Sequence, residues 1–183
     1  MGSEKMDDET LVQKCVSGNA EAQRKLFDRF SPLMLGVAMR YIKDKERAED
    51  VLQDGFIKVY KNLSRFEHKG SLEGWIRRII VNTALDEIRK NKKNLNDLHL
   101  DDSNFEIVQS SDAIGILEAE VLMEIIQQLP DGYRVVFNMF AIEGYSHKEI
   151  AETLEISEST SKSQYSRAKS VLRKTLKKYN IER

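Results

Sequence analysis

The chain has 183 residues and a mass of 21.1 kDa, with 29 Lys and Arg against 30 Asp and Glu, and 40% of its residues are apolar. This size allows one ordinary domain or two small ones, and the apolar content excludes a disordered chain. The single cysteine, Cys15, excludes an internal disulfide and argues against a cysteine-based metal site. No apolar run approaches about 18 residues and no signal-peptide pattern occurs, so we expect a cytoplasmic protein without a membrane span.

Charge is strongly segregated along the chain, although the net charge is only −1. Residues 77–93 carry six basic and two acidic side chains, and residues 162–183 carry eight basic and one acidic. Between them, residues 94–124 carry eight acidic side chains and no Lys or Arg. Two basic segments separated by an acidic one indicate two polyanion-binding surfaces, although solvated helix faces would give the same pattern.

Helical periodicity runs through the first half of the chain. The pattern predicts a helix over 8–17, then a helix capped by Asn19 with a kink or break at Pro32. A third helix is expected after a cap at Asp44, and a fourth from Ser71 to about residue 92. The expected core positions of these helices are Ala22, Leu26, Phe30, Leu33, Val37, Tyr41, Val51, Leu52, Gly55, Phe56, Val59, Tyr60, Leu63, Leu72, Trp75, Ile76, Ile79, Ile80 and Thr83.

Residues 94–116 lose this periodicity and are rich in Asp, Asn and Ser, which predicts a flexible acidic linker at a domain boundary. Helix is expected to resume near residue 117, to stop at Leu129, and to restart with Pro130 in its first turn. Gly144 ends that helix. We therefore expect an all-α fold with two small helical domains, over 6–93 and 117–183.

The last part of the chain predicts a helix-turn-helix. Ser146 and Glu149 have the spacing of a capping box, and the short helix that they open ends at Leu154. After a three-residue break, Ser157 caps a long last helix, whose first polar side chains are placed for a DNA major groove. A helical hairpin that binds nothing would share this pattern. The expected core positions of the last helix are Tyr165, Ala168, Leu172, Leu176 and Tyr179.

Catalytic chemistry finds no support in the sequence. His68, His99 and His147 are scattered and lack metal-ligand spacing, so we interpret them as surface histidines. Neither a Gly-rich phosphate loop nor a nucleophile motif occurs. The sequence thus predicts a protein that is not an enzyme and that uses no metal, cofactor or small-molecule substrate. Cys15 is expected to be a small buried apolar residue.

Several blocks of sequence resemble one family. Residues 50–60, DVLQDGFIKVY, and 75–86, WIRRIIVNTALD, resemble region 2 of bacterial sigma factors of the extracytoplasmic function group. Residues 129–137, with GYSHKEIA at 144–151 and SRAK at 166–169, resemble region 4 of the same group. The resemblance implies an RNA polymerase sigma factor that binds the polymerase core and directs initiation at promoters. Region 2 would recognise and open the −10 element, and region 4 would read the −35 element.

The resemblance also implies roles for particular residues, carried over position by position. The helix that docks on the polymerase clamp matches Asp50, Gln53, Asp54, Phe56 and Ile57. The surface that binds the −10 element, with an amide for an unstacked base and basic groups for phosphates, matches Asn82, Arg77, Arg78, Arg89 and Lys90. The stretch that reads the −35 element matches Ser159, Thr160, Lys162, Ser163, Gln164 and Arg167.

Spacing alone leaves a plainer interpretation open for some of these positions. The residues that match the clamp-docking helix recur three or four residues apart, which fits a contact strip or an ordinary solvated face. Asp86 is expected to pair with Arg89 in a structural role, and Trp75 to belong to the core instead of stacking on a base.

Two positions depart from the family pattern. Glu155 stands where many such turns carry Gly, which suggests a different turn conformation. Ser161 stands where Val is common, which suggests one weakened core contact.

The resemblance implies three kinds of partner: the polymerase core, through its β′ clamp and β subunits, promoter DNA, and an anti-sigma factor. The acidic linker would thread a basic channel of the polymerase. Two alternatives stay open. A stand-alone helix-turn-helix regulator would bind duplex DNA without polymerase and would leave residues 50–60 unexplained. An interaction protein that sequesters a partner through its N-terminal bundle would have no affinity for DNA.

Overall fold

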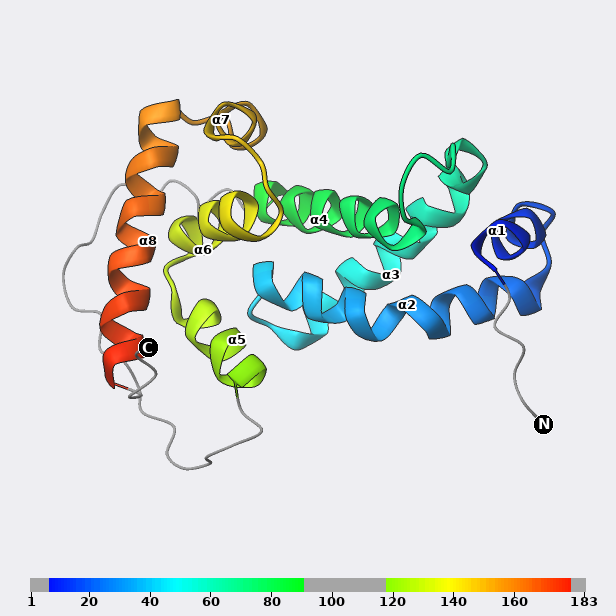
Figure 1. Ribbon diagram of the computed structural model, residues 1–183, viewed down its shortest axis with the longest axis horizontal. Helices are drawn as coiled ribbons and strands as arrows, with labels where there is room; N and C mark the ends of the chain where they lie inside the picture. The colour runs from blue at the N-terminus through cyan, green and yellow to red at the C-terminus, as the bar shows by residue number, and fades with distance from the viewer. Residues whose placement is uncertain (1–6, 91–117, 179–183) are drawn as a thin grey trace. The chain divides into compact units, whose positions relative to one another are not determined.

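The computed structural model describes residues 7–90 and 118–178 of the chain (Figure 1). These residues form helices and contain no strand, which confirms the all-α prediction for the described part of the chain. The chain divides into two compact units, Met1–Glu87 and Ile88–Arg183. The linker predicted over 94–116 lies outside the described residues.

Unit 1 is built from α1, α2, α3, a 3₁₀ turn η1 and α4, which span Asp8–Val16, Ala20–Tyr41, Lys45–Asn62, Leu63–Arg65 and Leu72–Lys90. The predicted caps are confirmed. The Asn19 side chain accepts from the backbone N–H of Ala22 at 2.8 Å, and Asp44 accepts from that of Arg47 at 2.8 Å. Ser71 Oγ accepts from the N–H of Gly74 at 3.0 Å. Each cap satisfies an N–H that the first helical turn leaves without a backbone partner.

Of the kink or break predicted at Pro32, the break is absent, because α2 runs as one helix of 22 residues through this residue. A proline inside a helix costs roughly 3 kcal/mol. Both flanks of Pro32 bury large apolar side chains, including Phe30 and Met34, and this burial offsets the cost. The core position expected at Leu33 is also wrong, since this side chain is 48% exposed and Met34 takes its place.

The core of unit 1 centres on the inner faces of α2 and α3. The ring of Phe56 meets that of Phe27 edge-on, with centroids 4.8 Å apart. The Tyr60 hydroxyl donates to the backbone carbonyl of Gln23 at 2.9 Å, and burial raises the pKa of Tyr60 to about 12. Cys15 is buried as predicted, and burial raises the pKa of its thiol.

Helix α3 approaches α4 closely at Gly55. A Cβ added at Gly55 would collide with Cδ1 of Ile80, a side chain that is fully buried. Two ion pairs flank this approach: Arg47 with Glu87 at 2.9 Å, and Lys58 with Asp86 at 3.0 Å.

The two interior glycines of α2 and α3 are expected to respond oppositely to alanine. Gly36 in α2 has open space around its Cβ direction, so Gly36→Ala should stabilise the protein by about 0.5–1 kcal/mol through helix propensity alone. Gly55→Ala should instead destabilise it by about 1–2 kcal/mol, because overpacking against Ile80 outweighs the same propensity gain. Urea unfolding of the two variants measures the difference. Equal effects of the same sign would contradict the close approach.

Unit 2 contains α5, α6, a π-helical turn η4, α7 and α8, which span Glu118–Gln128, Asp131–Phe137, Asn138–Ile142, His147–Leu154 and Glu158–Lys178. Pro130 is the cap residue just before α6, one position earlier than the first-turn place predicted for it. Gly144 adopts a φ of +78°, a left-handed conformation that glycine tolerates, and ends this helical segment as predicted. The π turn was not predicted.

The inner face of α8 is polar. Its buried residues are Ser161, Gln164, Ala168 and Thr175. Of the predicted core residues, only Ala168 is buried, while Tyr165, Leu172 and Leu176 are half-buried, and Tyr179 lies outside the described residues. The face of α8 that packs against the core therefore differs from the apolar face that the sequence predicts.

Candidate nucleic-acid interface

Three predicted surfaces can be located in the structure, and the first lies on α3. Asp50, Gln53, Asp54 and Ile57 are all exposed, and we call these four residues the α3 strip. Ile57 is 49% exposed, and it is the large apolar side chain that this helix face presents. An apolar side chain among carboxylates is suited to a partner that is itself apolar and basic.

Phe56 does not join the α3 strip. Its side chain is only 2% exposed and packs against the rings of Phe27 and Tyr60. The physical reason is helix phase, because each residue turns the side-chain direction by about 100° and Phe56 points inward where Ile57 points outward. Phe56 thus supports the strip from beneath.

The second surface lies on α4. Arg78, Asn82 and Lys90 are exposed, while Arg77 and Arg89 are half-buried. Positions 78, 82 and 89 follow helical spacing and share one face of α4. An amide flanked by guanidinium groups can bind a base edge and its neighbouring phosphates.

Asp86 was expected to pair with Arg89 within α4, and the structure gives it a partner on another helix. Its carboxylate accepts from Lys58 Nζ of α3 at 3.0 Å, so it links α4 to α3. Trp75 is half-buried, and its ring lies 5.6 Å from that of Phe66, which places it at the edge of the core. No sequence signal joins Lys58 to Asp86, since their meeting depends on how the two helices pack.

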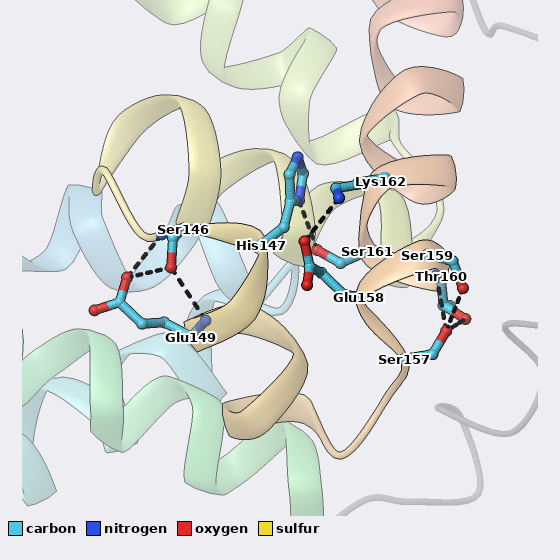
Figure 2. A network of polar contacts seen from close by, with 9 residues as sticks. All are labelled: Ser146, His147, Glu149, Ser157, Glu158, Ser159, Thr160, Ser161 and Lys162. Atoms are coloured by element: carbon cyan, nitrogen blue, oxygen red, sulfur yellow. Dashed lines mark hydrogen bonds and ion pairs between the residues drawn. The ribbon is translucent and has the colours of Figure 1, made fainter.

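The third surface is the helix-turn-helix of α7 and α8, drawn in Figure 2. The predicted capping box is present: Ser146 Oγ accepts from the N–H of Glu149 at 3.2 Å, and Glu149 Oε2 accepts from the N–H of Ser146 at 2.8 Å. Ser157 Oγ accepts from the N–H of Thr160 at 3.0 Å and so caps α8, as predicted. These caps hold both ends of a tight turn between the helices.

The turn keeps the conformation that glycine would adopt, so the expectation of a different turn at Glu155 is wrong. Glu155 has φ 56° and ψ 42°, in the left-handed region. The N–H groups of Glu155 and Ile156 both donate to the carbonyl of Ala151, which closes the turn. The departure from glycine therefore changes the strain of the turn and leaves its shape intact.

Glu155→Gly is expected to stabilise the protein by roughly 0.5–1 kcal/mol. The left-handed conformation costs a non-glycine residue about 1–2 kcal/mol, and the greater freedom of glycine in the unfolded chain cancels part of the gain. Glu155→Ala, which keeps the backbone penalty, is the matched control and should give no such increase. Urea unfolding of both variants is the measurement. An equal gain in both would assign the effect to the glutamate side chain.

Most of the candidate −35 contacts on α8 are exposed, and one is half-buried. Ser159, Lys162, Ser163 and Arg167 are exposed, and Thr160 is half-buried with its hydroxyl 2.7 Å from that of Ser157. Lys162 pairs with Glu158 at 2.7 Å, and Arg167 Nη1 donates to the Tyr133 hydroxyl at 3.4 Å. The accessible polar and basic side chains thus lie on the outer face of α8.

Gln164 does not share the outer face of α8 with the other candidate −35 contacts. Its side chain is only 4% exposed and faces the interior of unit 2. The spacing of Gln164 from Ser161 and Ala168 places all three on the inner face of α8.

Ser161 is fully buried and makes a contact that valine could not. Its Oγ lies 2.9 Å from Nδ1 of His147, the first residue of α7. The His147 ring also stacks on Phe140, with centroids 4.2 Å apart and an interplanar angle of 14°, and meets Tyr165 edge-on. The surface role predicted for His147 is therefore incomplete, because this half-buried ring joins η4, α7 and α8.

Across residues 7–90 and 118–178, no group of three or more His, Cys, Asp or Glu side chains is gathered as metal ligands would be. Within the same ranges, no helix combines the length and apolar character that crossing a membrane requires.

Comparison with family models gives two matches in separate parts of the chain. Residues 26–94 match Sigma-70 region 2, and residues 119–172 match Sigma-70, region 4. The first range contains the α3 strip and the basic face of α4, and the second contains the helix-turn-helix.

Curated relatives match over nearly the whole chain. The ECF RNA polymerase sigma factor SigW of Bacillus subtilis is 30% identical over 180 residues, which cover 91% of this chain and 95% of the relative. The RNA polymerase sigma-H factor of Pseudomonas aeruginosa is 26% identical over 180 residues, which cover 92% of this chain and 93% of the relative.

Two solved structures share the fold. The sigma factor RpoE in complex with the anti-sigma factor NepR, from Bartonella quintana, matches with a TM-score of 0.51 and 24% identity, covering 84% of this chain and 96% of that chain. CnrH in complex with the cytosolic domain of CnrY matches with a TM-score of 0.50 and 23% identity, covering 93% of this chain and 97% of that chain.

Proposed function

This chain belongs to the extracytoplasmic function group of the sigma-70 family of RNA polymerase sigma factors, and we propose that its two units divide promoter recognition between them. Region 2, over 6–93, would bind the polymerase core and the −10 element. Region 4, over 117–183, would read the −35 element, with residues 94–116 as the linker. In this proposal the protein acts by binding, in the cytoplasm, and is not an enzyme.

The observation that carries the proposal is the separation of an acidic, partly apolar surface from basic ones. In unit 1 the α3 strip combines two carboxylates with exposed Ile57, which suits a protein partner. The face of α4 with Arg78 and Asn82, and the outer face of α8 with Lys162 and Arg167, combine cations with polar groups, which suits DNA.

The core partner in this proposal is the β′ clamp, with the β subunit as a further contact. A protein interface needs a desolvated apolar anchor, and Ile57 supplies one at the end of the α3 strip. The carboxylates of Asp50 and Asp54 would provide charge complementarity and steering towards a basic partner surface.

An anti-sigma factor is the further partner that we propose. The similar solved structure of RpoE contains the anti-sigma factor NepR, and that of CnrH contains the cytosolic domain of CnrY. In this chain, Leu33 and Ile57 are large exposed apolar side chains of unit 1, 48% and 49% exposed. An inhibitor that covers them would bury apolar surface and block access to the polymerase.

A pair of variants tests the division of labour between the units. Holoenzyme with Asn82→Ala should lose its discrimination among −10 sequences and keep its discrimination among −35 sequences, because only the α4 amide is removed. Lys162→Ala should weaken binding through the −35 region and leave −10 discrimination intact. Run-off transcription on promoters altered in one element at a time measures both.

DNA binding by the free chain, with and without polymerase core, distinguishes a sigma factor from a stand-alone regulator. If the free chain binds duplex DNA tightly and the addition of polymerase core changes neither affinity nor specificity, then the helix-turn-helix acts by itself. Equal loss of discrimination at both elements in both variants would also overturn the division proposed for units 1 and 2.

A further inference from the structure

The site of interest is the junction of α7 and α8, where His147 is held from three sides. Its Nδ1 lies 2.9 Å from the buried Oγ of Ser161 on α8. Phe140 of η4 stacks on one face of the ring at 4.2 Å, and Tyr165 of α8 meets it edge-on at 5.9 Å. These contacts fix the direction in which the ring points.

The contact with Ser161 decides which ring nitrogen can meet a ligand. When Nδ1 accepts from the serine hydroxyl, the neutral ring carries its proton on Nε2. When the ring is protonated, Nδ1 donates to the same oxygen and Nε2 keeps its proton. In the other neutral tautomer Nδ1 donates to Ser161 and Nε2 is an acceptor. In every case Nδ1 is engaged with Ser161, so Nε2 is the ring nitrogen left for a partner, and in the protonated ring it donates.

Docking of a helix-turn-helix on DNA places this donor near the phosphate backbone. The second helix lies in the major groove and the first crosses the backbone strand, so the start of α7 faces phosphates when α8 enters the groove. Figure 2 shows the His147 ring beside the ion pair of Glu158 and Lys162. Lys162 of α8 is thus a cation close to the ring, and Lys148, the next residue along α7, is exposed.

We infer that His147 is a phosphate-contacting residue of the helix-turn-helix, that Ser161 positions it, and that protonation of His147 strengthens promoter binding. The inference rests on the proposed −35 role of unit 2. Histidine is the side chain whose charge changes most readily near physiological pH, so the contact would make promoter affinity depend on pH.

The charges around the ring decide the sign of this dependence. Desolvation and the Lys162 cation lower the pKa of His147, while Glu158 opposes them. Lys148 follows His147 along α7, and the rings that pack against His147 are those of Phe140 and Tyr165. Lys169 Nζ lies over the Tyr165 ring, 4.7 Å from its centroid. The free protein therefore holds His147 neutral at about pH 7. A DNA phosphate favours the charged ring, so binding takes up a proton and affinity rises as pH falls.

The test uses the full chain bound to polymerase core and a fluorescein-labelled duplex that carries a promoter selected by that holoenzyme. Fluorescence anisotropy at about pH 6 and about pH 8 gives the ratio of affinities. The wild-type ratio should exceed that of His147→Gln by about threefold to tenfold, the net size of one ordinary hydrogen bond in water. At about pH 6, His147→Gln should also reduce the slope of log affinity against log salt by about one.

Two further variants make the result specific. Ser161→Val keeps the histidine and fills the buried site with an apolar side chain, so it should remove at least half of the extra pH dependence while the chain stays folded. His68→Gln, which removes an exposed histidine of unit 1, should retain the wild-type ratio. Circular dichroism confirms that each variant is folded.

An unchanged pH ratio and salt slope in His147→Gln, with Arg167→Ala still weakening binding, would overturn the inference and leave the −35 role of unit 2 intact. If Arg167→Ala and Lys162→Ala both bind the promoter as the wild type does, the proposed −35 role itself fails. A wild-type pH profile in Ser161→Val would assign the effect to His147 alone and refute the positioning role of Ser161.

Discussion

Replacing Ile57 with Glu is expected to weaken binding to RNA polymerase core by about tenfold to a hundredfold, the range of an anchor residue at the centre of an interface. The Ile57 side chain is 49% exposed and lies on the same helix face as Asp50, Gln53 and Asp54. A glutamate there loses the apolar contact and adds a third carboxylate that must be desolvated. Titration of the labelled chain with purified core measures the dissociation constant.

A matched variant separates this effect from a general effect of added charge. Val16 is 50% exposed, lies on α1 outside the α3 strip, and also becomes a carboxylate in Val16→Glu. We expect its affinity for core to stay within about twofold of the wild type. Equal losses of core affinity in the two variants would show that the α3 strip is not the binding surface.

Replacing Arg167 with Ala is expected to weaken holoenzyme binding to its promoter by about tenfold to a hundredfold, since a bidentate arginine contact with guanine is worth about 1–3 kcal/mol. Arg167 is exposed on the outer face of α8, about 100° around the helix from buried Ala168. Because the contact reads a base, preference at one −35 position should also relax. A competition assay with single-position variants of the −35 element measures both effects.

Gln164→Met provides the contrast on the same helix. Gln164 is buried, and within the part of the chain that the structure describes its Oε1 has no hydrogen-bond partner. Methionine has a similar shape without the polar cost, so stability should hold or rise, and base preference should stay as in the wild type. A changed preference in Gln164→Met at the position that Arg167→Ala relaxes would place Gln164 in the groove and contradict its buried position.

Local signals made much of the fold predictable from the sequence. The caps at Asn19, Asp44, Ser146 and Ser157 were found because a side chain that accepts from an N–H three residues later needs only a short stretch of chain. Pro32 shows the limit of such reasoning. Its local preference for ending a helix is outweighed by burial on both sides, which depends on packing between distant segments.

The candidate site was predictable in its position and less so in its details. Matching a family motif names residues by their place in the sequence, whereas exposure depends on helix phase. Phe56 and Gln164 were therefore named with their exposed neighbours although both point inward. The His147 and Ser161 contact carries no sequence signal, since it exists only where α7 and α8 cross.

If this chain is a sigma factor, it must join polymerase core and select promoters, and both properties can be measured in one experiment. Purified chain is passed with bacterial RNA polymerase core over a size-exclusion column, and the co-eluting complex transcribes a library of genomic fragments. We expect co-elution and run-off products from a restricted set of fragments that share −10 and −35 elements. A chain that elutes apart from core, and binds duplex DNA with the same specificity when alone, would contradict this expectation.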